Sequence, residues 1–387
     1  MEPDRRPQLL DRVIKTFLRE RHIPGALVSV VQAGQTLLHQ AYGLARLEPP
    51  CPTPVILKDH SLIGSVTKSM TCYLISLLVS HGKLRFSDHL SQWFPQLPFS
   101  HDVTIMMLCN MTSGIPSYST SEEFGRILET DPYRQFTPEE LLAFAYRQPY
   151  MFEPGTAWFY SNTNTVLLGL ILEELYQQPA SAIFQEQLFQ QFGLYTSLLS
   201  TGRDRKYPLV DGYDLSRGEQ AIPGQAAPGQ AALELVNTTC FNTSWTFTAG
   251  AVVSALNDAA RWSTVLGLQP QLTPEVRAQR YDMATVGMVY KDNILFTDSF
   301  YYAVGLVYNN GWTYHNGSVP GYNANCSYFH GKRGSWEADG GRDHQDGDIA
   351  VAILLNLSDL AVGNLADQLW VAIAEIVTPD NIPQNIP

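Results

Sequence analysis

Segments with the character of β-strands occur at both ends of this 387-residue chain, whereas its middle is helical and rich in loops. The strand-like segments are 26–31, 36–42, 303–308, 313–315, 322–330 and 349–356. Helical patterns cover 9–20, 65–80, 138–147, 163–177 and 360–376. The simplest way to bury strands from both ends is one antiparallel sheet, flanked by helices and with a helical insertion packed beside it. We therefore expect an α/β (α+β) fold.

This pattern suggests two lobes that share one interface. A discontinuous sheet lobe would hold residues 1–115 and 235–387, and a mainly helical lobe would hold residues 116–234. We expect an active site in the cleft between them, because ligand sites favour such junctions. Two further segments, 216–232 and 331–347, have the Gly-rich polar composition of loops.

The composition excludes several classes of protein. The net charge is −12, from 37 acidic and 25 basic residues, and no Lys/Arg cluster provides the basic face of a nucleic-acid binder. No apolar run is long enough to span a bilayer, and the polar beginning of the chain does not resemble a signal peptide. Five widely spaced cysteines are typical of reduced thiols. We expect a cytoplasmic protein; the sequence does not determine its oligomeric state.

A candidate nucleophile lies at the start of the 65–80 helix. Ser65 and Lys68 are three positions apart, so both side chains lie on one helix face and the amine can reach the hydroxyl. Lysine can accept the serine proton if burial lowers its pKa. The positive end of the helix dipole would also favour a developing alkoxide at Ser65. Ser80 and Lys83 repeat the spacing, but at a helix C-terminus, where the dipole is unfavourable.

Two further motifs contain groups that suit acyl transfer. Tyr160 offers a phenol for proton relay, and Asn162, two positions later, offers an amide that can hold a substrate amide. His315, Gly317 and Ser318 lie at the end of the 313–315 strand, where a glycine lets a substrate backbone approach the strand edge. The Ser318 and Ser65 N–H groups would together form an oxyanion hole.

In this order, the motifs resemble the Ser-x-x-Lys, Tyr-x-Asn and Lys/His-x-Gly motifs of the penicillin-recognising serine hydrolases. That family includes class C β-lactamases, D-alanyl-D-alanine carboxypeptidases, D-aminopeptidases, D-amino-acid amidases and esterases. Segments 82–95, 112–115, 152–162 and 248–258 are also similar to family patterns, so the resemblance covers roughly residues 10–375. It implies a β-lactamase/transpeptidase-like fold and an acyl-enzyme formed on Ser65, with Lys68 and Tyr160 moving protons. It implies no metal and no organic cofactor.

Two positions depart from the family pattern. His315 stands where true β-lactamases carry lysine. Histidine is only partly charged at neutral pH, so it would hold a substrate carboxylate less firmly, and we expect weak or absent β-lactamase activity. Met111 stands where many relatives have histidine, and we expect this change to be structural.

Other readings of the sequence give different functions. The chain lacks the Gly-x-Ser-x-Gly of α/β-hydrolases and the His-Glu-x-x-His of metalloproteases. The acidic and histidine residues at 330 and 343–348 are interpreted as a solvated loop. Within the resembled family, the alternatives to an amide or ester hydrolase are an acyltransferase or peptide cyclase, and a penicillin-binding sensor that deacylates slowly. The substrate would be a small molecule or peptide.

Substrate specificity is expected to lie in the helical insertion and in segments 118–136 and 216–245 of the chain. These segments and the residues next to them contain aromatic side chains that would line a cleft or, equally well, pack in the core. The aromatic residues are Tyr118, Phe124, Tyr133, Trp245 and Phe247.

Overall fold

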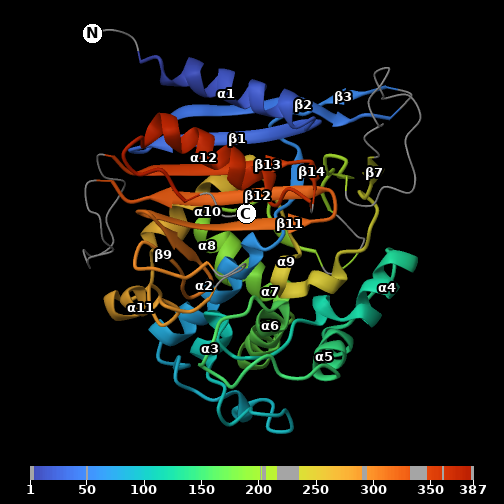
Figure 1. Ribbon diagram of the computed structural model, residues 1–387, viewed down its shortest axis with the longest axis vertical. Helices are drawn as coiled ribbons and strands as arrows, with labels where there is room; N and C mark the ends of the chain where they lie inside the picture. Colours follow the sequence, from blue (N-terminus) through green and yellow to red (C-terminus); the bar gives the residue numbers. More distant parts are fainter. Residues whose placement is uncertain are drawn as a thin grey trace.

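A computed structural model describes residues 4–48, 51–200, 202, 206–215, 235–289, 294–331, 347–359 and 361–384. Its centre is an eight-stranded sheet in the order β3-β2-β1-β13-β12-β11-β10-β9, with each neighbouring pair antiparallel (Figure 1). The strands are β1 Gly25–Gln32, β2 Gln35–Arg46, β3 Thr53–Pro54, β9 Phe300–Tyr302, β10 Val307–Asn309, β11 Trp312–Val319, β12 Tyr322–Phe329 and β13 Ile349–Leu355. Because β1 pairs with β13, both chain ends build one sheet, which confirms the predicted fold class.

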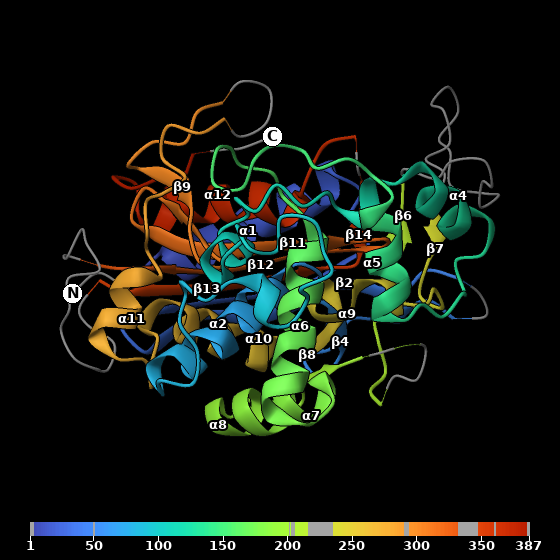
Figure 2. The ribbon, with the colours of Figure 1, turned by 90° about the horizontal axis from the view of Figure 1, so that it is seen from below.

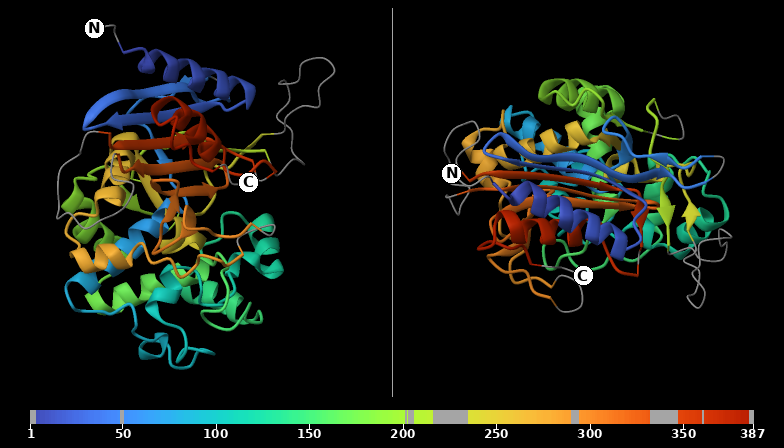
Figure 3. Two further views of the ribbon diagram at one scale, coloured as in Figure 1. Left: turned by 60° about the vertical axis from the view of Figure 1, so that its left-hand side comes forward. Right: turned by 90° about the horizontal axis from the view of Figure 1, so that it is seen from above.

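Helices cover both faces of this sheet (Figures 1 and 3). The terminal helices α1 Arg6–Glu20 and α12 Leu365–Val377 contact each other and pack on one face, whereas α10 Leu256–Leu268 packs on the other. β13 shows why both faces need a cover. Its alternate residues Val351 and Ile353 join the core beneath α1 and α12, and Ala352 and Leu354 join the larger core on the α10 side.

A layer of helices lies beyond that second face (Figure 2). Its central helix α6 Asn162–Tyr176 packs against α2 Val66–Ser80 and α9 Phe247–Gly250. The shorter helices are α3 Ile105–Cys109, α4 Glu122–Thr130, α5 Pro138–Tyr146, α7 Ala180–Phe184, α8 Gln190–Phe192 and α11 Pro274–Gln279. Two small sheets complete the fold: β4 His60–Leu62, β8 Val252–Ala255 and β5 Leu198–Leu199; and β14 Leu357–Ser358, β6 Tyr213–Asp214 and β7 Val236–Asn237.

Three element predictions were wrong in their bounds. Segment 303–308 is not one strand: only Val307 and Tyr308 belong to a strand, β10, and the residues before them form the turn from β9, in which Gly305 has φ +63°. β11 does not end at residue 315 but continues to Val319, because it pairs with β12 along its whole length. The last helix begins at Leu365 rather than 360, since the Asn364 side chain accepts the Ala366 and Asp367 N–H groups and caps it.

The predicted loops fall largely outside the described residues. The described residues include none of 216–232 and none of 332–346. Of the second specificity segment, 216–245, they include residues 235–245. Asp348, at the edge of the second loop, is buried and accepts the Tyr328 hydroxyl and the Gly331 N–H, so its solvated interpretation was wrong. None of the helices in the described part of the chain is long and apolar enough to cross a membrane.

Candidate active site

Ser65 lies at the N-terminus of α2, directly after the left-handed residue Gly64. A serine in this position often caps the helix, but the Ser65 side chain makes no capping hydrogen bond. Its hydroxyl instead accepts a hydrogen bond from Lys68 Nζ at 3.0 Å. The side chain is half-buried, so its oxygen is available to a proton acceptor and to solvent on the same face.

Lys68 is fully buried one turn further along α2. Its amine also donates to the Ala249 carbonyl oxygen at 2.7 Å and lies 4.9 Å from the centroid of the Tyr160 ring. No carboxylate forms an ion pair with Lys68 among the described residues. Burial without a counter-charge disfavours the ammonium form and lowers the pKa of Lys68 from 10.5 to about 7.

Tyr160 and Asn162 come from the start of α6, which the helix packing places beside α2. The Tyr160 ring contacts the rings of Tyr302 and His315 at centroid distances of 6.2 and 6.5 Å. The Asn162 side chain is half-buried, and its Nδ2 donates to Ser119 Oγ at 3.0 Å. The structure therefore brings Tyr160 to the lysine, while the Asn162 amide nitrogen is held by the segment around Ser119.

His315 is buried in β11 and is neutral at physiological pH. Its Nδ1 lies 2.6 Å from the Asn316 carbonyl oxygen, which can only accept, so Nδ1 carries the proton. Nε2, 3.3 Å from the Tyr302 hydroxyl oxygen, is then free to accept that hydrogen bond. Burial, together with the nearby Lys68 amine, lowers the pKa of His315 to about 3. The expected partial charge at neutral pH is therefore wrong.

Gly317 and Ser318 lie where β11 meets the beginning of α2. A Cβ atom on Gly317 would lie 1.9 Å from the Ile63 carbonyl oxygen and 2.8 Å from Ser65 N. A Cβ atom on Gly64 would lie 2.8 Å from Ser318 N. Because both positions are glycine, the main chain of β11 can approach the main chain at the start of α2 this closely, so the Ser318 and Ser65 main-chain groups are near each other. Ser318 is exposed, so this spot is open to solvent.

The open spot continues along one edge of β11. β10 pairs only with Trp312 to Tyr314, so no described strand covers the edge from His315 to Val319. The opposite side of this segment is fixed by α12, where Asn364 Nδ2 donates to the Gly317 carbonyl at 2.9 Å. Asp367 accepts from Asn316 and Asn325, and its burial raises its pKa to about 6.

Several of these groups carried no sequence signal. The Ala249 carbonyl is a main-chain group, although it lies in a segment similar to a family pattern, and Tyr302 belongs to no motif. The aromatic residues expected at the cleft are divided. Tyr118, Phe124 and Phe247 are buried in the core, Trp245 packs half-buried against it, and Tyr133 is exposed. Met111, fully buried, accepts from Asn164 through its sulfur atom.

Comparison with known proteins identifies the class. The Beta-lactamase family profile matches residues 10–375, nearly the whole chain, so the protein belongs to this family. The fold agrees with that of a D-stereospecific amidohydrolase from Streptomyces sp. (TM-score 0.73, 20% identity, 97% of this chain and 99% of the other). It also agrees with that of D-amino acid amidase from Ochrobactrum anthropi SV3 complexed with D-phenylalanine (TM-score 0.71, 21% identity, 95% of this chain and 99% of the other).

Curated relatives show weaker similarity over part of the chain. Protein flp of Staphylococcus aureus (strain N315) is 29% identical over 219 residues, which cover 54% of this chain and 41% of flp. Penicillin-binding protein 4* of Bacillus subtilis (strain 168) is 28% identical over 220 residues, 54% of this chain and 46% of that protein. The chain thus spans less than half the length of these relatives. An octameric penicillin-binding protein homologue from Pyrococcus abyssi shares the fold (TM-score 0.71, 22% identity, 97% and 79% coverage).

Proposed function

We propose that this protein is a serine hydrolase that cleaves an amide or ester through an acyl-enzyme on Ser65. The observation that carries the proposal is the 3.0 Å contact between Ser65 Oγ and the amine of Lys68, whose pKa burial lowers to about 7. A buried amine with this pKa is half neutral at pH 7 and can accept the serine proton.

The reaction then follows from the placement of the groups. Neutral Lys68 takes the Ser65 proton as Oγ attacks the substrate carbonyl carbon. The proton is passed through the Tyr160 phenol to the leaving nitrogen or oxygen as its bond to the carbonyl carbon breaks. Water repeats the sequence on the acyl-enzyme and releases the acid. The Lys68 amine lies 4.9 Å from the Tyr160 ring centroid, so the lysine and the tyrosine belong to one site.

The oxyanion of the tetrahedral intermediate would be held by the Ser65 and Ser318 N–H groups. Val319 and Tyr322 close a two-residue hairpin between β11 and β12, and hydrogen-bonded pairs alternate along such a ladder. The N–H of Ser318, one position before Val319, is therefore expected to point away from β12 to the open edge. A substrate can lie against this edge as an added strand.

The substrate class follows from the charge of the site. Neutral His315 provides no cation for a carboxylate, so weak or absent β-lactamase activity remains our expectation. The chain shares its fold with a D-stereospecific amidohydrolase and a D-amino acid amidase, which supports an uncharged D-amino-acid amide or small ester as the substrate. Acyl transfer to an amine in place of water is the alternative outcome of the same acyl-enzyme.

A small p-nitrophenyl ester tests the mechanism. Ser65→Ala and Lys68→Ala should each abolish turnover, because each removes one partner of the proton transfer. Ser80→Ala is the matched control, since Ser80 is at the other end of α2 and only accepts the Thr273 N–H there. Turnover that survives in Ser65→Ala would refute the proposal. A phosphonate probe should label Ser65, and adding an amine to the assay separates hydrolysis from transfer.

A further inference from the structure

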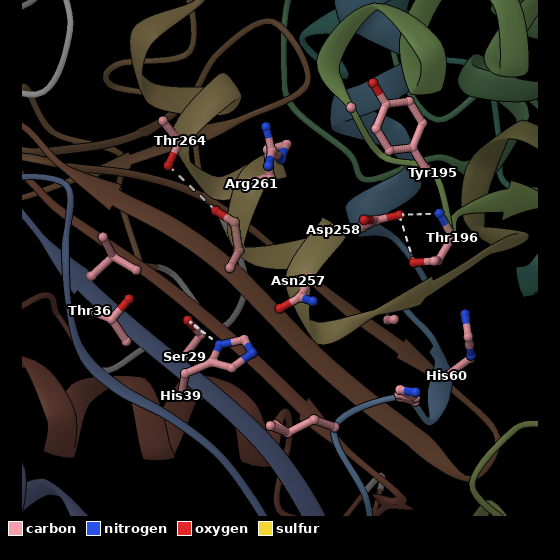
Figure 4. Close-up of a pocket in the computed structure, with 16 residues that line it drawn as sticks. Ser29, Thr36, His39, His60, Tyr195, Thr196, Asn257, Asp258, Arg261 and Thr264 are labelled. Atoms are coloured by element: carbon pink, nitrogen blue, oxygen red, sulfur yellow. Dashed lines mark hydrogen bonds between the residues drawn. The ribbon is translucent and has the colours of Figure 1, made fainter.

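A second pocket lies away from Ser65, with a volume of about 800 Å³ (Figure 4). It opens between the β1–β2 hairpin, α10 and the segments around Lys58 and Tyr195. The β4–β8 ladder lies between this pocket and the catalytic residues. At one end of the ladder, His60 and Ala255 line the pocket; at the other end the Ile63 N–H donates to the Val252 carbonyl, two residues before Ser65. His60 and Ser65 are five positions apart in the sequence, a span of up to about 16 Å when the chain is extended.

Two exposed cations, Lys58 and Arg261, line this pocket, and neither forms an ion pair with a described residue. The one acidic residue of the lining, Asp258, is already engaged, since its Oδ2 accepts from Thr196 N, Thr196 Oγ1 and Ser197 Oγ at 2.8–2.9 Å. In a chain of net charge −12, this is a local excess of positive charge.

His60 gives an independent sign of a missing ligand. Its side chain is only 6% exposed, and its ring nitrogens approach main-chain groups of Thr196 and Lys58 without forming a hydrogen bond of good geometry. The ring is held in place by stacking on Tyr207 at a centroid distance of 4.4 Å. Buried polar atoms without partners are costly, so a bound group that reaches the imidazole would remove this cost.

Part of the remaining wall is apolar and exposed, beside polar side chains such as Thr36, His39 and Asn257. Leu57 is 40% exposed and Tyr195 is 73% exposed, so both side chains are open to a bound molecule. Val31, Ala255 and Ala260 extend this surface. The cavity therefore offers positive charge and apolar surface within one volume that suits a small organic molecule, with Arg261 beside Gly193 and Lys58 next to Leu57.

We propose that this pocket binds a small organic carboxylate with an aromatic or aliphatic body, at a site separate from the Ser65 centre. Lys58 and Arg261 hold the carboxylate, and the body lies along Leu57 and Tyr195. The imidazole of His60 hydrogen-bonds to the bound molecule. This proposal does not depend on the proposed hydrolase activity.

Calorimetric titration with phenylacetate tests the site, with phenylacetamide as its uncharged counterpart. We expect phenylacetate to bind about tenfold more tightly, because two partly exposed charge contacts together contribute this much. The double variant Lys58→Gln/Arg261→Gln should lose that about tenfold advantage. Lys83→Gln/Arg85→Gln, which removes the same charge from exposed residues outside the pocket, should bind as the wild type does.

Two further variants make the outcome decisive. His60→Phe keeps the stacked ring but removes its nitrogens, and should weaken phenylacetate binding about threefold. Lys68→Met tests whether binding requires the catalytic lysine, and it should leave the affinity for phenylacetate unchanged. Equal binding of acid and amide, no binding at millimolar concentration, or loss of binding in Lys68→Met alone would overturn the proposal. Circular dichroism confirms that each variant is folded.

Discussion

Replacing Lys68 by methionine should stabilise the protein while it abolishes turnover. The unfolded chain holds its Lys68 proton up to pH 10.5, whereas the buried amine releases it near pH 7. Between these values the unfolded state binds more protons, so raising the pH increases the stability of the wild type. A tenfold change in proton affinity corresponds to about 1.4 kcal/mol, so burying this lysine costs about 4 kcal/mol at pH 7 and about 2 kcal/mol at pH 9.

Methionine removes this cost but leaves another. It fills a similar volume, yet the Ala249 carbonyl loses its donor, which costs about 1–3 kcal/mol. With about 2 kcal/mol lost in this way, Lys68→Met should be about 2 kcal/mol more stable than the wild type at pH 7 and about equal to it at pH 9. The change in this difference with pH between 7 and 9 comes from Lys68, because His315, the buried group that the Lys68 charge also affects, is kept neutral in this range mainly by its own burial.

Urea denaturation of both proteins between pH 7 and pH 9 measures this difference. Lys15→Met is the control, because Lys15 is exposed on α1 and pairs with Asp11, so its difference from the wild type should hardly change with pH. A Lys68→Met difference that is constant across the range would refute the reasoning, since Lys68 would then be charged in the folded state. A variant less stable than the wild type at pH 7 would also refute it.

Two other predictions concern turnover and the approach of β11 to α2. The kcat/KM for ester hydrolysis should rise about tenfold per pH unit below pH 7 and level off above it, because neutral Lys68 is required. His315, whose pKa is about 3, should add no inflection near the ordinary pKa of histidine. A stopped-flow or plate assay across pH 5–9 that shows a flat profile below about pH 7 would contradict this. Gly317→Ala should lower the free energy of unfolding by about 1–3 kcal/mol and impair turnover, because the added Cβ meets Ile63 O and Ser65 N. Gly125→Ala, in α4 with no atom within 4 Å of the added Cβ, should not destabilise the fold, and equal effects of both substitutions in denaturation would contradict the packing argument.

The fold class was predictable because it rests on patterns that each segment carries by itself. Alternating or continuous apolar residues mark β1, β2, β12 and β13, and the apolar run after Ser65 marks α2. What could not be predicted depends on contacts between distant segments. The strand-like run turns at Gly305, where the chain has a positive φ. A side chain at this position would meet Cys72, which lies on α2.

The candidate site shows the same division. The contact between Ser65 and Lys68 was predictable from their spacing, because helix geometry relates residues that are close in sequence, whereas Tyr160 was proposed from its motif and the loop before it. The lysine's carbonyl partner at Ala249 and the Tyr302 hydroxyl beside His315 belong to other elements and have no local signature. Burial decided the rest: Tyr118 and Phe247 had equal odds of lining a cleft or filling the core, and both fill it.

The pairing of β1 with β13 has a consequence for how the protein is made. The Gly25 N–H donates to the Asn356 side chain at 2.7 Å, 331 positions further along the chain. During synthesis the β1–β2 hairpin must therefore wait, with one edge open, until nearly all of the polypeptide has left the ribosome. Such long-range pairing slows folding and exposes a strand edge to aggregation. A chain that stopped before β11 would contain Ser65 and Lys68, but not the strand against which they are placed.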